Sequence, residues 1–280
     1  MNVDLHCHSD RSDGLLAPAA LVARACLHGV DVLALTDHDT VSGLEEARAA
    51  AAPTALRLVD GVEISVTWRG RTLHVLGLGI DPGNAALRAG LDTVQAGRLE
   101  RARGMAESLA EAGIPDALEG ALGHAKNPAM LSRTHFARHL VATGKVSDMR
   151  AAFRAYLVSG KPGYVEHRWS TLQAATGWIC GAGGQAVLAH PGRYALSAGA
   201  LEGLLAEFRA VGGSGLEVVS GSHSEGEAAS WTAVALHGGW RASRGSDFHA
   251  PGEGAELGGV AALDARLDPV WRAFSPAPGH

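Results

Sequence analysis

Nine imidazole or carboxylate side chains fall at or near the ends of segments that we expect to be strands. The chain is rich in histidine, with 14 among 280 residues, and histidine is the commonest metal ligand in proteins. Burying such groups without partners is costly, and a cluster of metal ions would give each of them a partner. A ligand set of nitrogen and oxygen without thiolate suits manganese, iron or zinc, and disfavours calcium. The nine candidate metal ligands are His6, His8, Asp13, His38, Glu63, His74, His190, Asp247 and His249.

Each of these signals has a simpler interpretation when it is taken alone. A pair of histidines two residues apart, such as His6 and His8, is often incidental, although in a strand both side chains point the same way. Glu63 alone fits a strand residue that faces solvent, and His74 or His190 alone fits a hydrogen-bonded core histidine. The joint pattern favours a metal site.

The composition narrows the class of protein. The chain is 46% hydrophobic and 19% charged, which is ordinary for a soluble globular protein. It has no run of about 18 apolar residues that would indicate a membrane span, and its N-terminus lacks signal-peptide features, so we expect a cytoplasmic protein. The three cysteines form no Cys-x-x-Cys pair, which argues against a disulfide framework and a thiolate zinc site. A net charge of −5 argues against binding to duplex nucleic acid, but it is compatible with a small anionic substrate.

Strands that alternate with helices predict an α/β fold with a mainly parallel sheet, and such folds place their chemistry at the C-terminal ends of the strands. Period-two and continuous apolar runs indicate the strands, and period-3.6 runs with an early proline or a following glycine indicate the helices. The expected strands are 3–8, 32–36, 56–68, 72–78, 185–189, 215–219 and 240–243, and the expected helices are 18–27, 44–52, 200–211 and 225–237.

Between residues 84 and 164 the pattern changes to Ala, Arg, Leu and Glu at helical spacing, with few strand signals. We therefore expect a helical insertion at 84–164 within a main α/β domain formed by 1–83 and 165–280. Inside the insertion, Arg98, Arg101 and Arg103 are expected on a solvated helix face. The tail after Pro251 is expected to be irregular.

Five short motifs together resemble the PHP family, the polymerase and histidinol phosphatase domain. They are His-Cys-His-Ser at 6–9, Thr-Asp-His-Asp-Thr at 36–40, Gly-Val-Glu-Ile at 61–64, Ala-His-Pro at 189–191 and Ser-Asp-Phe-His at 246–249. The resemblance covers the chain from end to end except for the helical insertion. It implies a distorted (β/α)7 barrel with the insertion as a cap.

The resemblance also implies a site for two to three divalent metal ions, with manganese favoured over iron or zinc. Neighbouring ions share a hydroxide that attacks phosphorus, and they neutralise charge on the phosphate oxygens. Asp37 and Asp39 are expected to orient the ligand imidazoles. In this family's pattern His6, His8, Glu63 and Asp247 hold one ion, Glu63, His74 and His190 a second, and Asp13, His38 and His249 a third.

A phosphatase also needs cationic donors for phosphate oxygens, and arginine suits this role because its planar fork binds two oxygens. Arg193 follows the Ala-His-Pro motif, and Arg133 lies in Ser-Arg-Thr-His-Phe at 132–136. Taken alone, Arg193 fits a surface loop and Arg133 the start of a helix capped by Ser132. Together with Gly-Lys-Pro-Gly-Tyr-Val at 160–165 and Ala-His-Pro-Gly-Arg-Tyr at 189–194, the 132–136 segment resembles the 3′,5′-nucleotide bisphosphate phosphatases of the family, relatives of which degrade short RNA from the 5′ end. This implies that Arg133, His135 and Arg193 contact substrate phosphate.

Other functions stay open at this point. A phosphatase of a non-nucleotide monoester such as histidinol phosphate is one alternative, and a noncatalytic metal-binding module is another. A polymerase-attached exonuclease is disfavoured because 280 residues leave no room for polymerase domains. The expected partner is a small phosphorylated nucleotide or short oligonucleotide, and the oligomeric state is undetermined.

Overall fold

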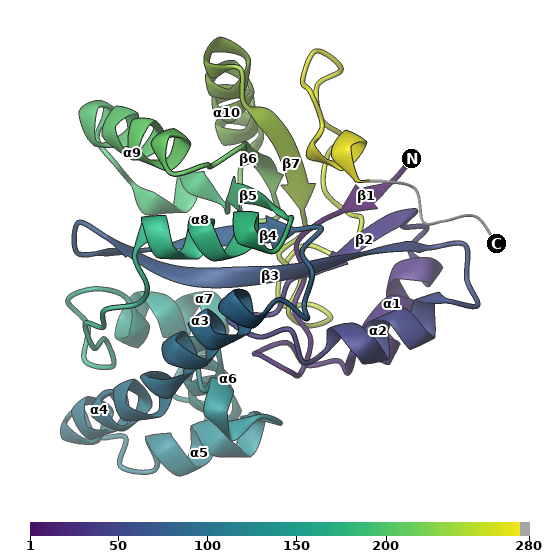
Figure 1. The fold of residues 1–280 in the computed structure, drawn as a ribbon. Coiled ribbons are helices and arrows are strands. Elements are labelled where there is room, and N and C mark those ends of the chain that lie inside the picture. Colours follow the sequence, from purple (N-terminus) through teal and green to yellow (C-terminus); the bar gives the residue numbers. More distant parts are fainter. Residues whose placement is uncertain (275–280) are drawn as a thin grey trace.

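The structure is a computed structural model that describes residues 1–274, and its centre is one seven-stranded sheet that curls into a barrel (Figure 1). The strands follow one another in sequence order around the sheet. Leu5 N donates to Arg244 O and Asp247 N donates to His6 O, so the first and last strands meet and nearly close the barrel. The strands are β1 (Val3–Asp4), β2 (Val32–Leu35), β3 (Arg57–Trp68), β4 (Arg71–Leu78), β5 (Gln185–Leu188), β6 (Gly215–Ser220) and β7 (Arg241–Gly245).

The sheet is mixed, because β4 runs antiparallel to both β3 and β5, whereas the other neighbouring pairs are parallel. A tight turn joins β3 to β4. Its two residues, Arg69 and Gly70, have φ of 46° and 77°, as the turn of a two-residue hairpin requires. The predicted α/β barrel is confirmed, with this hairpin as its main departure from a parallel sheet.

The first strand is shorter than expected, because only Val3–Asp4 has regular pairing. Beyond it, side-chain acceptors supplement the backbone hydrogen bonds. Cys7 N donates to Thr36 Oγ1 at 3.1 Å, and Ser9 N donates to Asp37 Oδ1 at 2.7 Å. The backbone amides of residues 5–9 therefore all have hydrogen-bond acceptors, although these residues do not belong to a longer strand.

In the described part of the chain, five helices outside residues 84–164 cover the barrel, and their ends carry the expected signals. Pro18 occupies the first turn of the first helix, and Gly29 follows that helix with φ of 67°. Ser224 and Glu227 form a capping box at the start of another. These helices are α1 (Pro18–Leu27), α2 (Leu44–Ala51), α8 (Leu172–Gly181), α9 (Ala198–Ala210) and α10 (Glu225–Gly238). None of the helices that the structure describes is both long and apolar enough to cross a bilayer.

The remaining helices lie together below β3 in Figure 1 and form what we call the lobe. Met105, Leu109, Phe136 and Leu140 belong to a core of its own, separate from the cores around the barrel. The segments in this region are α3 (Ala85–Ala96), α4 (Arg98–Glu111), α5 (Ala117–His124), α6 (Arg133–Ala142), α7 (Met149–Ala152), a 3-10 turn at Pro128–Met130 and a π-helical turn at Phe153–Leu157.

Helix α3 packs with the barrel rather than with the core of the lobe. Its Leu87 and Leu91 join the barrel core, and a Cβ added at Gly90 would lie 2.4 Å from the Trp178 ring on α8. The lobe core therefore begins with α4, and the division of the chain at residues 84 and 164 stays a prediction. After Pro251 the described chain is irregular except for a 3-10 turn at Val270–Ala273, and residues 275–280 of that tail lie outside the described range.

Candidate active site

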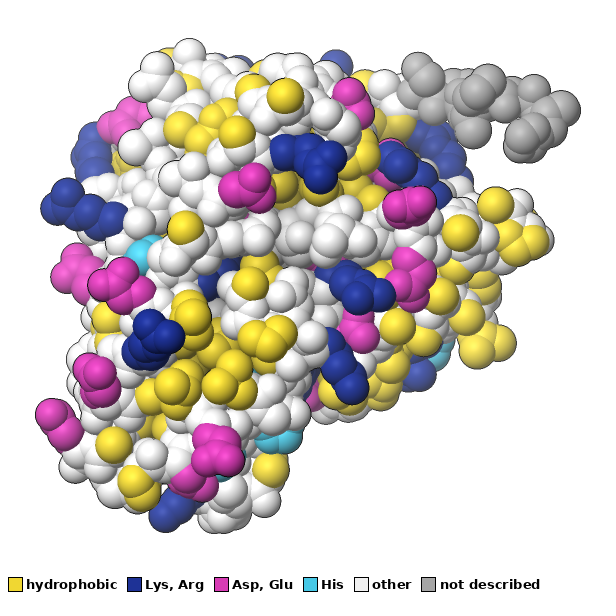
Figure 2. Space-filling model, turned by 60° about the horizontal axis from the view of Figure 1, so that its bottom comes forward, with side chains coloured by type: hydrophobic (Ala, Val, Ile, Leu, Met, Phe, Trp, Pro, Cys, Tyr) yellow, Lys and Arg dark blue, Asp and Glu magenta, His cyan; other side chains and the backbone are white. Residues whose placement is uncertain are grey.

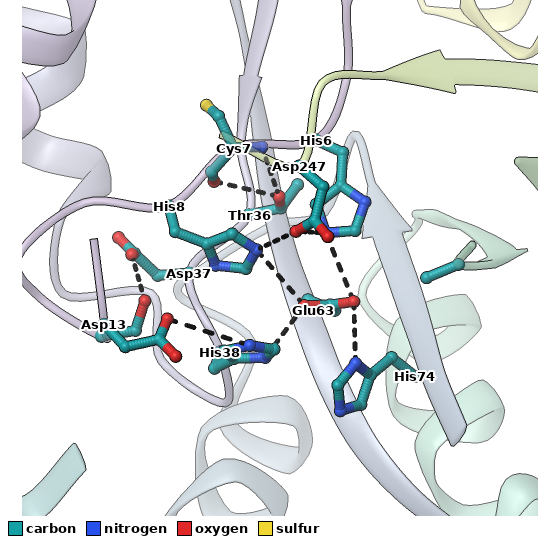
Figure 3. A network of polar contacts seen from close by, with 12 residues as sticks. His6, Cys7, His8, Asp13, Thr36, Asp37, His38, Glu63, His74 and Asp247 are labelled. Carbon is teal, nitrogen blue, oxygen red and sulfur yellow. Dashed lines mark hydrogen bonds and ion pairs between the residues drawn. The ribbon is translucent and has the colours of Figure 1, made fainter. Parts of the chain in front are cut away.

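Glu63, on β3, is the centre of the site and is completely buried. Figure 3 shows His6, His8, His38 and His74 pointing toward its carboxylate from separate segments of the chain. The distances from the carboxylate oxygens are 3.3 Å to His6 Nε2, 3.4 Å to His8 Nε2, 2.9 Å to His38 Nδ1, 3.1 Å to His74 Nδ1 and 3.0 Å to His190 Nε2. One carboxylate thus faces five imidazoles, a crowding that a simple hydrogen-bonded core does not need.

Two further carboxylates extend this cluster. Asp247 Oδ1 lies 3.4 Å from His6 Nε2 and 3.2 Å from His8 Nε2. On the other side, Asp13 Oδ1 lies 3.4 Å from His249 Nε2 and 3.9 Å from His38 Nε2. The nine residues expected from the sequence therefore meet in one place, although they come from the whole length of the chain.

The donor set fits divalent cations. Potential ligand atoms lie within 4.8 Å of one another in four overlapping groups, which share His6, His8, His38 and Glu63. Several of these atoms are buried and have no hydrogen-bond partner among the described residues, as expected of groups that bind an ion. Those atoms are His6 Nε2, His8 Nδ1, Asp13 Oδ1 and His190 Nδ1.

The protonation of the cluster is set by burial and by its own charges. Burial opposes ionisation of Glu63, but His74, His6 and His38 hold its pKa well below the usual value. Burial lowers the pKa of His8 to about 3, with repulsion from His249 and His38 adding to the effect. An ionised carboxylate and a neutral imidazole are the forms that bind metals.

Several residues in or beside the cluster have positive φ angles, which are rare outside glycine. The φ angles are 48° for Asp39, 29° for His190 and 54° for Asp247. Local bonds support them: His190 N donates to Glu217 Oε2 at 2.6 Å, and Ser65 N donates to Asp39 Oδ1 at 2.6 Å. Backbone strain of this kind persists only where surrounding contacts fix it, and it concentrates at functional sites.

The expected role of Asp37 and Asp39 is wrong. Asp37 accepts hydrogen bonds from Ser9 and Ser12, and Asp39 accepts from Ser65 and Arg98, so each carboxylate fixes a loop rather than an imidazole.

Glu217 on β6 orients an imidazole instead, because its Oε1 lies 2.9 Å from His6 Nδ1. It is fully buried, as are its neighbours along the strand. The sequence does contain a signal for this role, a charged residue inside an apolar strand, but the set of residues predicted from the motifs did not include Glu217.

A cavity of about 990 Å³ opens beside the cluster, between the barrel and the lobe. Asp13, His74 and Asp247 line its barrel side, and Arg133 and Arg193 line it as well. Arg193 Nη1 donates to Asp247 Oδ2 at 2.8 Å. Both arginines expected to contact phosphate therefore face the space where a substrate would lie.

His135 occupies a different position. It is only 1% exposed and is not among the described residues that line the cavity. Its Nδ1 accepts from Ser132 N at 3.1 Å and completes a capping box at the start of α6. His135 therefore stabilises the start of α6 and does not itself line the cavity.

The prediction of a solvated face on α4 is wrong for two of its three arginines. Arg98 is 4% exposed and pairs with Asp39, whereas Arg101 lines the cavity; only Arg103 is exposed. The guanidinium carbons of Arg98 and Arg101 lie 4.9 and 5.3 Å from the ring centre of Trp169. Their spacing of three residues puts both on one face of α4, but the sequence does not say that this face turns inward.

An α/β barrel with a cluster of imidazoles and carboxylates beside an arginine-lined cavity is the architecture of a metal-dependent hydrolase. The PHP domain family matches residues 4–210, and the chain belongs to this family. The five sequence motifs therefore indicated the right family.

Similar proteins with assigned activities agree with this. A 3′,5′-nucleoside bisphosphate phosphatase of Chromobacterium violaceum is 52% identical over 272 residues, which are 97% of this chain and 95% of that protein. The 5′-3′ exoribonuclease Rnm of Escherichia coli is 44% identical over 271 residues, 96% of this chain and 92% of its own. These relatives confirm the expected class of enzyme, a phosphoesterase.

A solved structure from Chromobacterium violaceum, described as an amidohydrolase with bound sulfate and no metal, superposes with a TM-score of 0.95. It is 51% identical, and the match covers 98% of this chain and 96% of that one. The whole architecture, including the lobe, is therefore shared with a solved protein.

Proposed function

We propose that the chain removes the 3′-phosphate from 3′,5′-bisphosphorylated nucleotides in a metal-dependent reaction. One observation carries this proposal: the cavity joins the Glu63 cluster to Arg101 and Arg133, two arginines with no carboxylate partner among the described residues. Such a cavity suits a substrate with two anionic groups.

The nine clustered residues would hold two to three divalent ions, with manganese as the first candidate and iron or zinc as the others. Bound ions of this kind supply positive charge at the phosphate and lower the pKa of coordinated water. In our assignment His6, His8, Glu63 and Asp247 would hold one ion, Glu63, His74 and His190 a second, and Asp13, His38 and His249 a third, since the members of each set are in contact.

Arg193 is placed to bind the phosphate that is hydrolysed. Its bond to Asp247 puts the guanidinium next to the cluster, and its side chain remains about half exposed toward the cavity. A guanidinium at this position can donate two parallel hydrogen bonds to phosphate oxygens. It also stabilises the negative charge that develops on those oxygens in the transition state.

Arg133 and Arg101 form the second anion-binding end of the cavity. Among residues 1–274, Arg133 Nη1 donates only to the carbonyl of Leu157, at 3.3 Å, and Arg101 Nε only to that of Val165, at 3.4 Å. Burial, with repulsion from Arg133 and Arg98, lowers the pKa of Arg101 to about 9. Because partly desolvated cations without counter-charges are costly, a second phosphate bound here would be favourable.

The test compares kcat/KM for adenosine 3′,5′-bisphosphate and adenosine 3′-monophosphate. We expect Arg101→Ala and Arg133→Ala to lower kcat/KM for the bisphosphate by about 10- to 100-fold, the value of one or two charge-assisted hydrogen bonds. Activity on the monophosphate and metal content should change little. Arg103→Ala, on the exposed face of α4, is the matched control.

Two results would contradict the proposal. Equal losses of kcat/KM on both substrates would show that Arg101 and Arg133 do not form a second anion-binding end. A wild-type preference for histidinol phosphate would assign the enzyme to the non-nucleotide phosphatases instead.

Short RNA with a 5′-phosphate is a second candidate substrate. The similarity to the Escherichia coli exoribonuclease supports it, and the same arginine pair would bind the terminal phosphate. On the face drawn in Figure 2, Lys and Arg side chains are interspersed with acidic ones rather than gathered in a stripe, so this face offers no track for longer nucleic acid. A strong preference for 5′-phosphorylated over unphosphorylated trinucleotides would support this candidate.

A further inference from the structure

Arg138, a residue of α6 that the site as described so far does not include, joins the lobe to two loops of the metal cluster. Its side chain is 7% exposed. Nη1 donates to the backbone oxygen of Asp13 at 2.8 Å, while Nε and Nη2 donate to the two carboxylate oxygens of Glu253 at 3.0 and 2.9 Å. A single buried guanidinium therefore holds the loop of one candidate ligand and a residue four positions beyond another, His249.

Ser132, the N-cap of α6, makes a second connection to the same ligand. Its hydroxyl accepts from Thr134 N at 3.1 Å and donates to Asp13 Oδ2 at 2.7 Å. The other oxygen, Oδ1, is buried, has no hydrogen-bond partner in the described part of the chain, and lies 3.4 Å from His249 Nε2. Because the hydroxyl occupies one oxygen, the carboxylate has a fixed rotation that turns Oδ1 toward the imidazoles.

We propose that Arg138 and Ser132 are positioning residues for the ion held by Asp13, His38 and His249. The lobe thus forms one side of the cavity and also fixes this part of the metal cluster. Ser132 sets the rotation of the Asp13 carboxylate. Arg138 fixes the backbone of Asp13 relative to the loop that contains His249. This inference rests on the proposed metal-dependent function.

The energetic argument follows from where the ligands sit. Asp13 lies in a turn nine residues beyond the end of β1, whereas the other candidate ligands lie within strands or no more than four residues beyond one. Loop ligands have more freedom to lose when they bind an ion. Contacts that orient ligands from outside typically change metal affinity by about 10- to 100-fold, so this position should depend on the lobe most strongly.

The experiment measures manganese binding to the full chain by titration, and tightly bound manganese by elemental analysis. We expect Arg138→Gln and Ser132→Gly each to lower the affinity for one manganese ion by about 10- to 100-fold and to leave the binding of the remaining ions unchanged. Glycine preserves most of the N-cap, so Ser132→Gly tests the bond to Asp13 rather than the helix start. Ser132→Thr keeps the hydroxyl and should retain full binding.

Arg24→Gln is the matched control. Arg24 on α1 forms the same kind of bidentate ion pair with Glu256, three residues beyond Glu253, and its hydrogen bonds do not involve Asp13. It should bind the full complement of manganese. Melting temperatures of the metal-free variants separate lost affinity from lost folding, and if Arg138→Gln does not fold, the Ser132 pair of variants decides.

Full manganese binding by Arg138→Gln and Ser132→Gly would overturn the inference, and so would an equal loss in Arg24→Gln. A wild-type protein that binds no manganese, iron or zinc would instead contradict the proposed function itself.

Discussion

Glu63 concentrates most of the chemistry of this site in one side chain. It is fully buried, within 3.4 Å of five imidazoles, while its neighbours Val62 and Ile64 on β3 pack into the apolar core. Alternation along the strand thus places one carboxylate inside the barrel and two hydrophobic residues outside it. Such a group is stable only if positive charge surrounds it, either from imidazolium or from metal ions.

His8 is the ligand whose removal tests the cluster most directly. Its Nε2 lies 3.2 Å from Asp247 and 3.4 Å from Glu63, and its Nδ1 has no described partner. We expect His8→Ala to lower metal content and abolish turnover with little loss of fold. Elemental analysis, a phosphatase assay and circular dichroism check this.

His28→Ala is the control for that prediction, because His28 is 39% exposed and is not one of the clustered residues. A His8→Ala protein that kept its metal and its activity would show that the assignment of His8 is wrong.

At the scale of elements, the meeting of β1 and β7 positions two candidate ligands at once. Asp247 N donates to His6 O, and a Cβ added at Gly245 would lie 2.3 Å from His6 Cβ and 2.7 Å from His6 N. Only glycine allows the strands to approach this closely. The same approach that closes the barrel therefore brings His6 to Asp247.

Gly245→Ala should separate these strands. We expect a loss of about 1–3 kcal/mol in the free energy of unfolding, as for other overpacked sites, together with reduced metal content because His6 is displaced. Urea unfolding and elemental analysis measure the two effects.

Gly226→Ala on the surface of α10 has open space around the added methyl group and should be neutral or slightly stabilising. Equal stability of the two variants would mean that the barrel closes with more freedom than the structure shows.

At the scale of the whole molecule, metal binding and folding are linked. The cluster joins segments from residue 6 to residue 249, so unfolding separates its members and destroys the site. An ion that binds only the folded chain stabilises it by mass action, by about 2.7 kcal/mol at 100 times its dissociation constant.

Chelation should therefore abolish activity and lower the melting temperature, and added manganese should restore both. We expect a difference of about 5–10 °C between the metal-free and manganese-bound protein, from that free energy and the usual entropy of unfolding. Differential scanning calorimetry with a parallel phosphatase assay measures it. Metal binding without any turnover would support a noncatalytic module instead of an enzyme.

The sequence by itself determined the fold class and the nine clustered residues, because both can be recognised from local sequence patterns. Strand and helix periods identify the α/β architecture, and imidazoles and carboxylates at strand ends are visible as motifs such as His6-Cys7-His8. Once parallel strands form a barrel, their C-terminal ends converge whatever the details of packing.

Only the tertiary structure decided which polar residues serve that cluster. Arg98 and Arg101 look like surface residues until α4 packs against the barrel, and Glu217 and Arg138 act on partners more than a hundred residues away. His135 has the same sequence context whether it faces the cavity or caps α6. Contacts of this kind depend on how separate elements are oriented, and local spacing in a sequence does not contain that orientation.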